Sequence, residues 1–142
     1  MSAPFSCDYA APLIALDRVL RCDPSGIVTQ KEVVADEPFF AGHFPGYPIY
    51  PGVFLMEAVH QAATYYGRVF LGRVTLREVR SARFLVPVFP GDVLEADCRT
   101  EVLPAGGGLK VEARCRCGTR TVAEVKLLYR VEDAVASQSR TD

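Results

Sequence analysis

The sequence lacks the features that mark several large classes of protein. It has no apolar run near the roughly 20 residues needed to span a bilayer. Its N-terminus has no basic start followed by an apolar block, so no signal peptide is expected. A net charge of -1 gives no overall attraction to nucleic acid or to an anionic membrane. We therefore expect a cytoplasmic protein with no membrane span and no nucleic-acid partner.

The cysteines form no recognisable framework. There are five, at Cys7, Cys22, Cys98, Cys115 and Cys117, and their spacings fit neither a disulfide scaffold nor a paired CxxC zinc site. Cys115 and Cys117 share a face of any strand that contains them, so two small buried thiols are expected rather than metal ligands. Nucleotide-binding motifs are absent as well. We therefore expect no metal and no cofactor.

The 142 residues suit one domain with a sizeable core, and 49% of them are hydrophobic. The pattern predicts one helix at 53–70, after a loop at 36–52 that holds four prolines. Strand-like segments are predicted on both sides of the helix, at 13–20, 27–34, 74–88, 93–103, 109–117 and 121–132. We predict an α+β domain over 1–132, an antiparallel sheet with the helix packed on one face, and a disordered tail at 133–142.

The predicted helix is apolar on nearly every side. Its interior exceptions fall at i, i+3, i+4 and i+7 and so form one narrow stripe: Glu57, His60, Gln61 and Thr64. In one interpretation this stripe is the solvated side of a surface helix. In the other, the helix is wrapped by the sheet and the stripe lines a buried polar site, since surface helices usually show a broader, more charged face. The pattern alone does not decide between them.

The proline-rich loop adds a histidine to this stripe. His43 is one of two histidines in the chain, and it lies in a loop whose backbone the prolines restrict, just before the helix. Gly52 places a bare backbone N–H at the positive end of the helix, where it can donate to a developing oxyanion. With Glu57, these groups are what acid–base chemistry beside an activated carbonyl requires. A lone histidine is more often structural, so the hypothesis depends on the three groups occurring together.

Three stretches resemble one enzyme family: "EPFFAGHFPGYPIYPGVFLMEAVHQAA", "ARFLVPVFPGDVLEAD" and "TVAEVKLLYRV". They resemble the FabZ-type 3-hydroxyacyl-[acyl carrier protein] dehydratases, and the similarity extends over residues 12–132. The resemblance implies a hotdog fold, in which a curled antiparallel sheet wraps around one long central helix. It also implies dimers whose sheets join edge to edge, often assembled as trimers of dimers.

The resemblance assigns roles to several residues. His43 of one subunit and Glu57 of the other would form each catalytic site, and Gly52 would bind the thioester carbonyl. Supporting or substrate-binding roles would fall to Gln61, Phe44, Pro45, Val53, Tyr50 and His60. Tyr47, Tyr50 and His60 depart from the family pattern, so the acyl-chain preference does not follow.

The implied reaction is dehydration of a (3R)-3-hydroxyacyl thioester to a trans-2-enoyl thioester, in fatty-acid or polyketide/polyene synthesis. The implied partner is an acidic acyl carrier protein. Candidates for its docking patch are Arg68, Arg73, Arg77, Arg80 and Arg83, although such arginines are more often a solvated face. Three alternatives stay open: a hotdog thioesterase, one subunit of a heterodimeric dehydratase, and an acyl-sensing regulator, for which the chain has no DNA-binding module.

Overall fold

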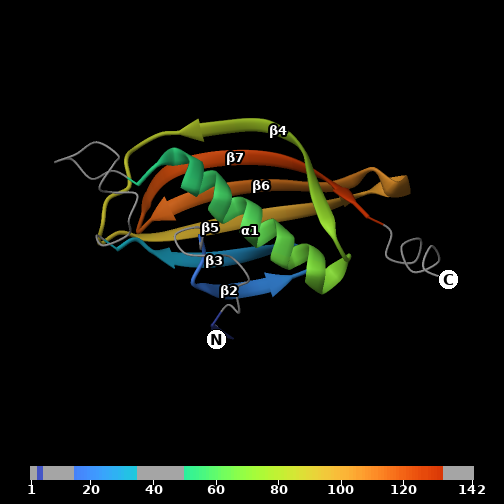
Figure 1. The fold of residues 1–142 in the computed structure, drawn as a ribbon, viewed down its shortest axis with the longest axis horizontal. Coiled ribbons are helices and arrows are strands. Elements are labelled where there is room, and N and C mark those ends of the chain that lie inside the picture. The colour runs from blue at the N-terminus through green and yellow to red at the C-terminus, as the bar shows by residue number, and fades with distance from the viewer. Residues whose placement is uncertain (1–2, 5–14, 35–49, 133–142) are drawn as a thin grey trace.

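The computed structural model describes residues 3–4, 15–34 and 50–132. One helix lies across one face of a single antiparallel sheet (Figure 1). The strands are β1 (Ala3–Pro4), β2 (Arg18–Asp23), β3 (Gly26–Glu32), β4 (Val74–Phe84), β5 (Val93–Leu103), β6 (Gly108–Cys117) and β7 (Arg120–Val131). The predicted α+β architecture is confirmed.

The strand order places β4 far from its neighbours in sequence. The order is β1-β2-β3-β5-β6-β7-β4, and every adjacent pair is antiparallel. β4 pairs with β7, from Val74 opposite Val131 to Phe84 opposite Ala123. The other side of β4 has no partner strand within the described chain. The chain therefore reaches this edge of the sheet by way of the helix, α1 (Gly52–Phe70), which precedes β4.

The helix is set in place at both ends. Pro51 precedes it in an extended conformation, which suits a residue that cannot donate a backbone hydrogen bond. At the other end the N–H groups of Leu71 and Gly72 both donate to the Gly67 carbonyl, at 2.8 and 2.6 Å. A Cβ on Gly67 would lie 2.8 Å from Val74 Cγ1, so glycine allows β4 to start close against the helix. In the described ranges, no helix has the length and apolar character needed to cross a membrane.

The apolar core lies between α1 and the sheet. The helix contributes Leu55, Ala58, Val59, Ala62, Ala63 and Tyr66 to it. From β6, the predicted inward set is buried in full: Leu109, Val111, Ala113, Cys115 and Cys117. The intervening charged residues of β6 face outward, as the strict alternation predicts.

Two predicted strand boundaries were wrong. The segment 13–20 was expected to be the first strand, yet Ala15 and Leu16 are buried without strand structure and β2 begins at Arg18. The prediction for 74–88 extended too far, because β4 ends at Phe84. Beyond it the N–H groups of Leu85 and Val86 share the Val122 carbonyl, at 2.8 and 3.4 Å. The predicted tail and the loop before residue 50 lie outside the described residues.

Candidate active site

The polar stripe of α1 is not a solvated surface. Glu57, His60 and Thr64 are half-buried, and Gln61 is only 1% exposed. A buried amide costs free energy unless its donors and acceptors are satisfied, so the stripe must have partners inside the protein. Of the two interpretations of the stripe, the structure supports the enclosed polar site.

Gln61 links the acid to a segment far away in sequence. Its Oε1 accepts a hydrogen bond from the Ala15 backbone N–H at 3.0 Å, and its Nε2 donates to Glu57 Oε2 at 2.8 Å. A backbone N–H can only donate, so the contact with Ala15 fixes which end of the amide faces Glu57. The carboxylate is therefore held in place from one side by a buried donor.

His60 is bound to the sheet beneath the helix. Its Nδ1 forms a hydrogen bond with the hydroxyl of Tyr129, with 2.8 Å between the two atoms. The two rings also stack, with their centroids 5.7 Å apart and their planes 9° apart. Tyr129 is fully buried on β7, so this pair satisfies its hydroxyl in the core. This contact gives His60 a structural explanation that the sequence did not suggest.

The start of α1 opens on a small apolar hollow. Gly52 is the first helical residue, and its N–H donates no hydrogen bond within the described part of the chain. The hollow measures about 240 Å³ and is lined by Tyr50, Gly52, Leu55, Phe84, Leu85, Val86, Pro87 and Val88. A helix N-terminus carries partial positive charge. The site therefore places the N-terminal N–H of the helix beside a mostly apolar wall.

Tyr50 packs and hydrogen-bonds within the wall of this hollow. Its side chain is buried, its ring lies 5.6 Å from that of Phe54, and its N–H donates to the Val88 carbonyl at 2.7 Å. The last contact ties the residues before the helix to those after β4. Tyr50 thus has a packing role that explains why a large aromatic stands there. Val53, by contrast, is 65% exposed and contributes no wall to the hollow.

A second hollow lies further along the helix. It measures about 570 Å³, lies beside the second half of α1, and is lined by His60, Thr64, Arg68, Gly72, Arg73 and Val74. The Thr64 hydroxyl donates to the His60 carbonyl of its own helix at 3.0 Å.

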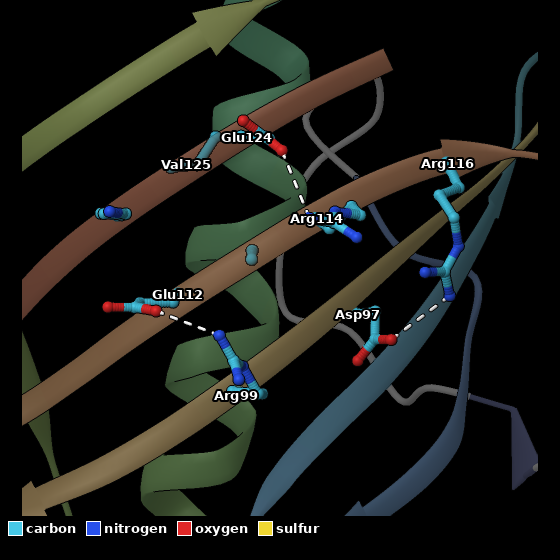
Figure 2. A pocket seen from close by; sticks show the side chains of 9 residues that line it. Asp97, Arg99, Glu112, Arg114, Arg116, Glu124 and Val125 are labelled. Carbon is cyan, nitrogen blue, oxygen red and sulfur yellow. Dashed lines mark hydrogen bonds and ion pairs between the residues drawn. The ribbon is translucent and has the colours of Figure 1, made fainter. Parts of the chain in front are cut away.

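A third hollow, of about 480 Å³, lies on the face of the sheet away from α1 (Figure 2). Its charged side chains satisfy one another: Arg99 with Glu112 at 3.3 Å, Arg116 with Asp97 at 3.3 Å, and Arg114 with Glu124 at 3.5 Å. Such paired, exposed charges are typical of a solvated sheet face. We therefore place the candidate site on the helix side.

The buried thiols of the sheet are unfavourably placed for chemistry. Burial raises the pKa of Cys98 well above the ordinary value, and it raises that of Cys115 to about 12. Within the described ranges, no group of three His, Cys, Asp or Glu side chains is arranged as metal ligands would be. The prediction that Cys115 and Cys117 are buried thiols is confirmed.

Known proteins match nearly the whole chain. A family model described as a FabA-like domain matches residues 10–139. The 3-hydroxyacyl-[acyl-carrier-protein] dehydratase FabZ of Chlamydia trachomatis serovar L2 is 38% identical, over 83% of this chain and 82% of the relative. The chain belongs to the FabZ dehydratase family.

Further relatives and several solved structures are similar to this chain. The enzyme of Desulforamulus reducens is 38% identical over 84% of this chain and 87% of its own. Among solved structures, the dehydratase heterocomplex ApeI:P of Xenorhabdus doucetiae has a TM-score of 0.68 at 17% identity, covering 94% of this chain and 93% of that one. The Pyrococcus horikoshii protein PH1136 has a TM-score of 0.70 at 19% identity, covering 92% and 95%. The predicted family and hotdog fold are confirmed.

Part of the predicted FabZ-type site lies outside the described residues, namely His43, Phe44 and Pro45. The described part brings Gly52, Glu57 and Gln61 into the first half of one helix. The sequence analysis did not predict that the ring of Phe84, at the end of β4, lies against Gly52. It also did not predict the hydrogen bond from the Ala15 N–H to Gln61. Neither has a spacing signal in the sequence, because both contacts come from the tertiary fold.

Proposed function

We propose that the chain dehydrates (3R)-3-hydroxyacyl thioesters carried on acyl carrier protein, giving trans-2-enoyl thioesters in fatty-acid or polyketide synthesis. The observation that carries this proposal is Glu57, a half-buried carboxyl group that accepts a hydrogen bond from the buried amide of Gln61. It lies about one and a half turns along α1 from Gly52, whose N–H makes no hydrogen bond within the described residues. Family membership supports the reaction, since the relatives bear the name of this dehydratase.

The reaction divides among three groups. His43 takes the proton from Cα, and the electron pair of that C–H bond forms the new C=C bond. As charge develops on the thioester oxygen, Gly52 N–H donates to it, and a donor of this kind is worth about 2.7–4 kcal/mol. The Cβ–O bond breaks, and Glu57 supplies the proton with which the hydroxyl leaves as water. The proton on His43 then returns to Glu57 through solvent, which restores both groups.

In this proposal the site is shared between two copies of the chain, His43 from one and Glu57 from the other. The free edge of β4 supports pairing: it is eleven residues long, it has no partner strand within the described chain, and Leu76 and Val79 are exposed on it. A long edge of this kind is normally covered in soluble proteins. A homodimer through β4 would cover it, and the predicted trimer of dimers would build on that unit.

The test is mass spectrometry of acyl carrier protein loaded with 3-hydroxyacyl chains of several lengths. Dehydration removes the mass of one water from the intact carrier conjugate, and the rate against chain length gives the preference. Release of the free carrier thiol instead would identify a thioesterase and contradict the proposal. Activity that appears only after a second hotdog chain is added would indicate a heterodimer.

A further inference from the structure

Phe84 lies directly over the first residue of α1. It is the last residue of β4 and is 49% exposed. A Cβ built on Gly52 would lie 3.4 Å from three atoms of that ring, Cδ1, Cδ2 and Cε1. Equal distances to atoms on both sides of the ring mean that Gly52 meets the ring face rather than its edge. The ring therefore covers one side of Gly52, whose N–H makes no hydrogen bond within the described part of the chain.

The residues around Phe84 are also apolar and partly exposed. Leu85 and Val86 follow it, and Val53 is the second residue of the helix. Single exposed apolar side chains are ordinary, but a group of four at one helix end is not. Phe84, Leu85 and Val86, with the buried ring of Tyr50, line an apolar hollow that faces the positive end of the helix dipole, and Val53 lies outside that lining.

We infer that Phe84 is the apolar wall of the thioester site, and that the hollow receives the thioester group and the methylenes next to it. This inference rests on the proposed function. The wall keeps water from the Gly52 N–H, and a hydrogen bond to a developing oxyanion is stronger in a water-excluded place. It also limits the positions that the thioester can adopt against the donor, and a displacement of about 1 Å costs about 100-fold in rate.

Phe84→Ala tests the wall, and Phe84→Leu tests whether apolar bulk suffices. We expect Phe84→Ala to lower kcat/KM for dehydration by roughly 10- to 100-fold, with most of the loss in kcat, because orientation at the donor is lost. Phe84→Leu should recover a large part of it. The matched control is Phe70→Ala: Phe70 is a partly exposed phenylalanine at the other end of the same helix, 4.9 Å from Tyr66.

The effect of Phe84→Ala on substrates of different acyl-chain length shows whether Phe84 contacts the thioester or the acyl chain. A contact with the thioester predicts the same fold-loss for short and long acyl chains. A loss that grows with chain length would place Phe84 in the acyl-chain pocket and overturn the inference. The inference would also be overturned if Phe84→Ala lowered kcat/KM no more than Phe70→Ala does. If the unmodified protein dehydrates none of the substrates, the proposed function itself fails. That result differs from the two results on Phe84→Ala, which both require an active unmodified protein.

Discussion

Gln61 Nε2 lies 2.8 Å from Glu57 Oε2, and the same amide accepts a hydrogen bond from the backbone of Ala15. The position of the proposed acid therefore depends on a residue more than forty positions earlier in the chain. The amide is buried, so no water replaces either contact without cost.

Replacing Gln61 should separate its hydrogen bond with Ala15 from its hydrogen bond with Glu57. Gln61→Leu removes both and leaves the Ala15 N–H without its acceptor, so we expect the free energy of unfolding to fall by about 1–3 kcal/mol. Gln61→Glu keeps an acceptor for Ala15 but places a second carboxylate beside Glu57, so it should lower dehydration more than stability. Denaturant unfolding and kcat on the same samples provide both measurements.

Thr64→Val is the control for these variants. The Thr64 hydroxyl bonds only its own helix in the described chain, so its loss should change stability by less than about 1 kcal/mol. Equal stability of Gln61→Leu and Thr64→Val would contradict the assigned role of the buried amide.

Mixing two inactive variants tests the shared site. His43→Ala and Glu57→Gln should each lower dehydration by at least about 100-fold, because each removes a proton-transfer group. After unfolding and refolding together, they should recover about a quarter of the unmodified activity, since half of the dimers are mixed and each mixed dimer holds one intact site. No recovery in dimers shown to be mixed by native mass spectrometry would mean that both groups come from one chain.

Reversing charge at the start of β4 tests carrier docking. Arg73 and Arg77 are exposed, whereas Arg80 lies 3.8 Å from Glu78 and Arg83 lies 3.3 Å from Glu124. Changing Arg73 and Arg77 to Glu should raise KM for the carrier-bound substrate by about tenfold at low salt, because complementary charge mainly speeds association. The KM of a small thioester analogue should not change.

A matched pair on the opposite face of the sheet provides the control. Arg99 and Arg114 lie in the hollow of paired charges, and reversing them should leave both KM values unchanged. If reversing Arg99 and Arg114 raises the carrier KM as much as reversing Arg73 and Arg77, docking does not depend on Arg73 and Arg77.

The turn between β2 and β3 should make stability depend on pH in acid. Hydrogen bonds from Ser25 and the ion pair with Arg21 lower the pKa of Asp23 from 3.8 to about 2. The folded state therefore holds this proton less tightly than the unfolded chain does. Its stabilising contribution is complete above about pH 4 and is lost as the pH falls towards 2.

Asp23→Asn removes the charge and should remove that dependence. The difference in unfolding free energy between the unmodified protein and the variant should shrink between about pH 4 and pH 2, measured by urea unfolding with circular dichroism. Arg21→Gln should remove only part of it, because the Ser25 bonds remain. A difference that stays constant through this range would show that Asp23 keeps its ordinary pKa.

Local pattern was enough to predict most of the elements. The helix was expected at 53–70 and is found at Gly52–Phe70, because Pro51 and Gly72 bound a long apolar segment. The first strand was predicted too early in the chain. Ala15 and Leu16 are apolar because they are buried in the core, and they do not pair with another strand. Their segment is held by the Gln61 contact and by the bond from Asp17 N–H to the Gln30 carbonyl, at 2.7 Å.

The contacts of the site were less predictable than its residues. Spacing alone put Glu57 and Gln61 on one face, since four residues make about one helical turn. It could not show that Tyr129 binds His60 or that Phe84 covers Gly52. Tyr129 and Phe84 both belong to strands that follow the helix. The sequence pattern does not predict which strand packs against which turn of the helix.

The position of β4 constrains how the protein forms during synthesis. Its one described strand partner is β7, the last strand of the described chain, and Phe84 pairs with Ala123 while Val74 pairs with Val131. As the ribosome delivers the chain, β4 emerges long before β7 and has no strand to join. We expect the exposed arginines of β4 to oppose aggregation of this segment until β7 has been made.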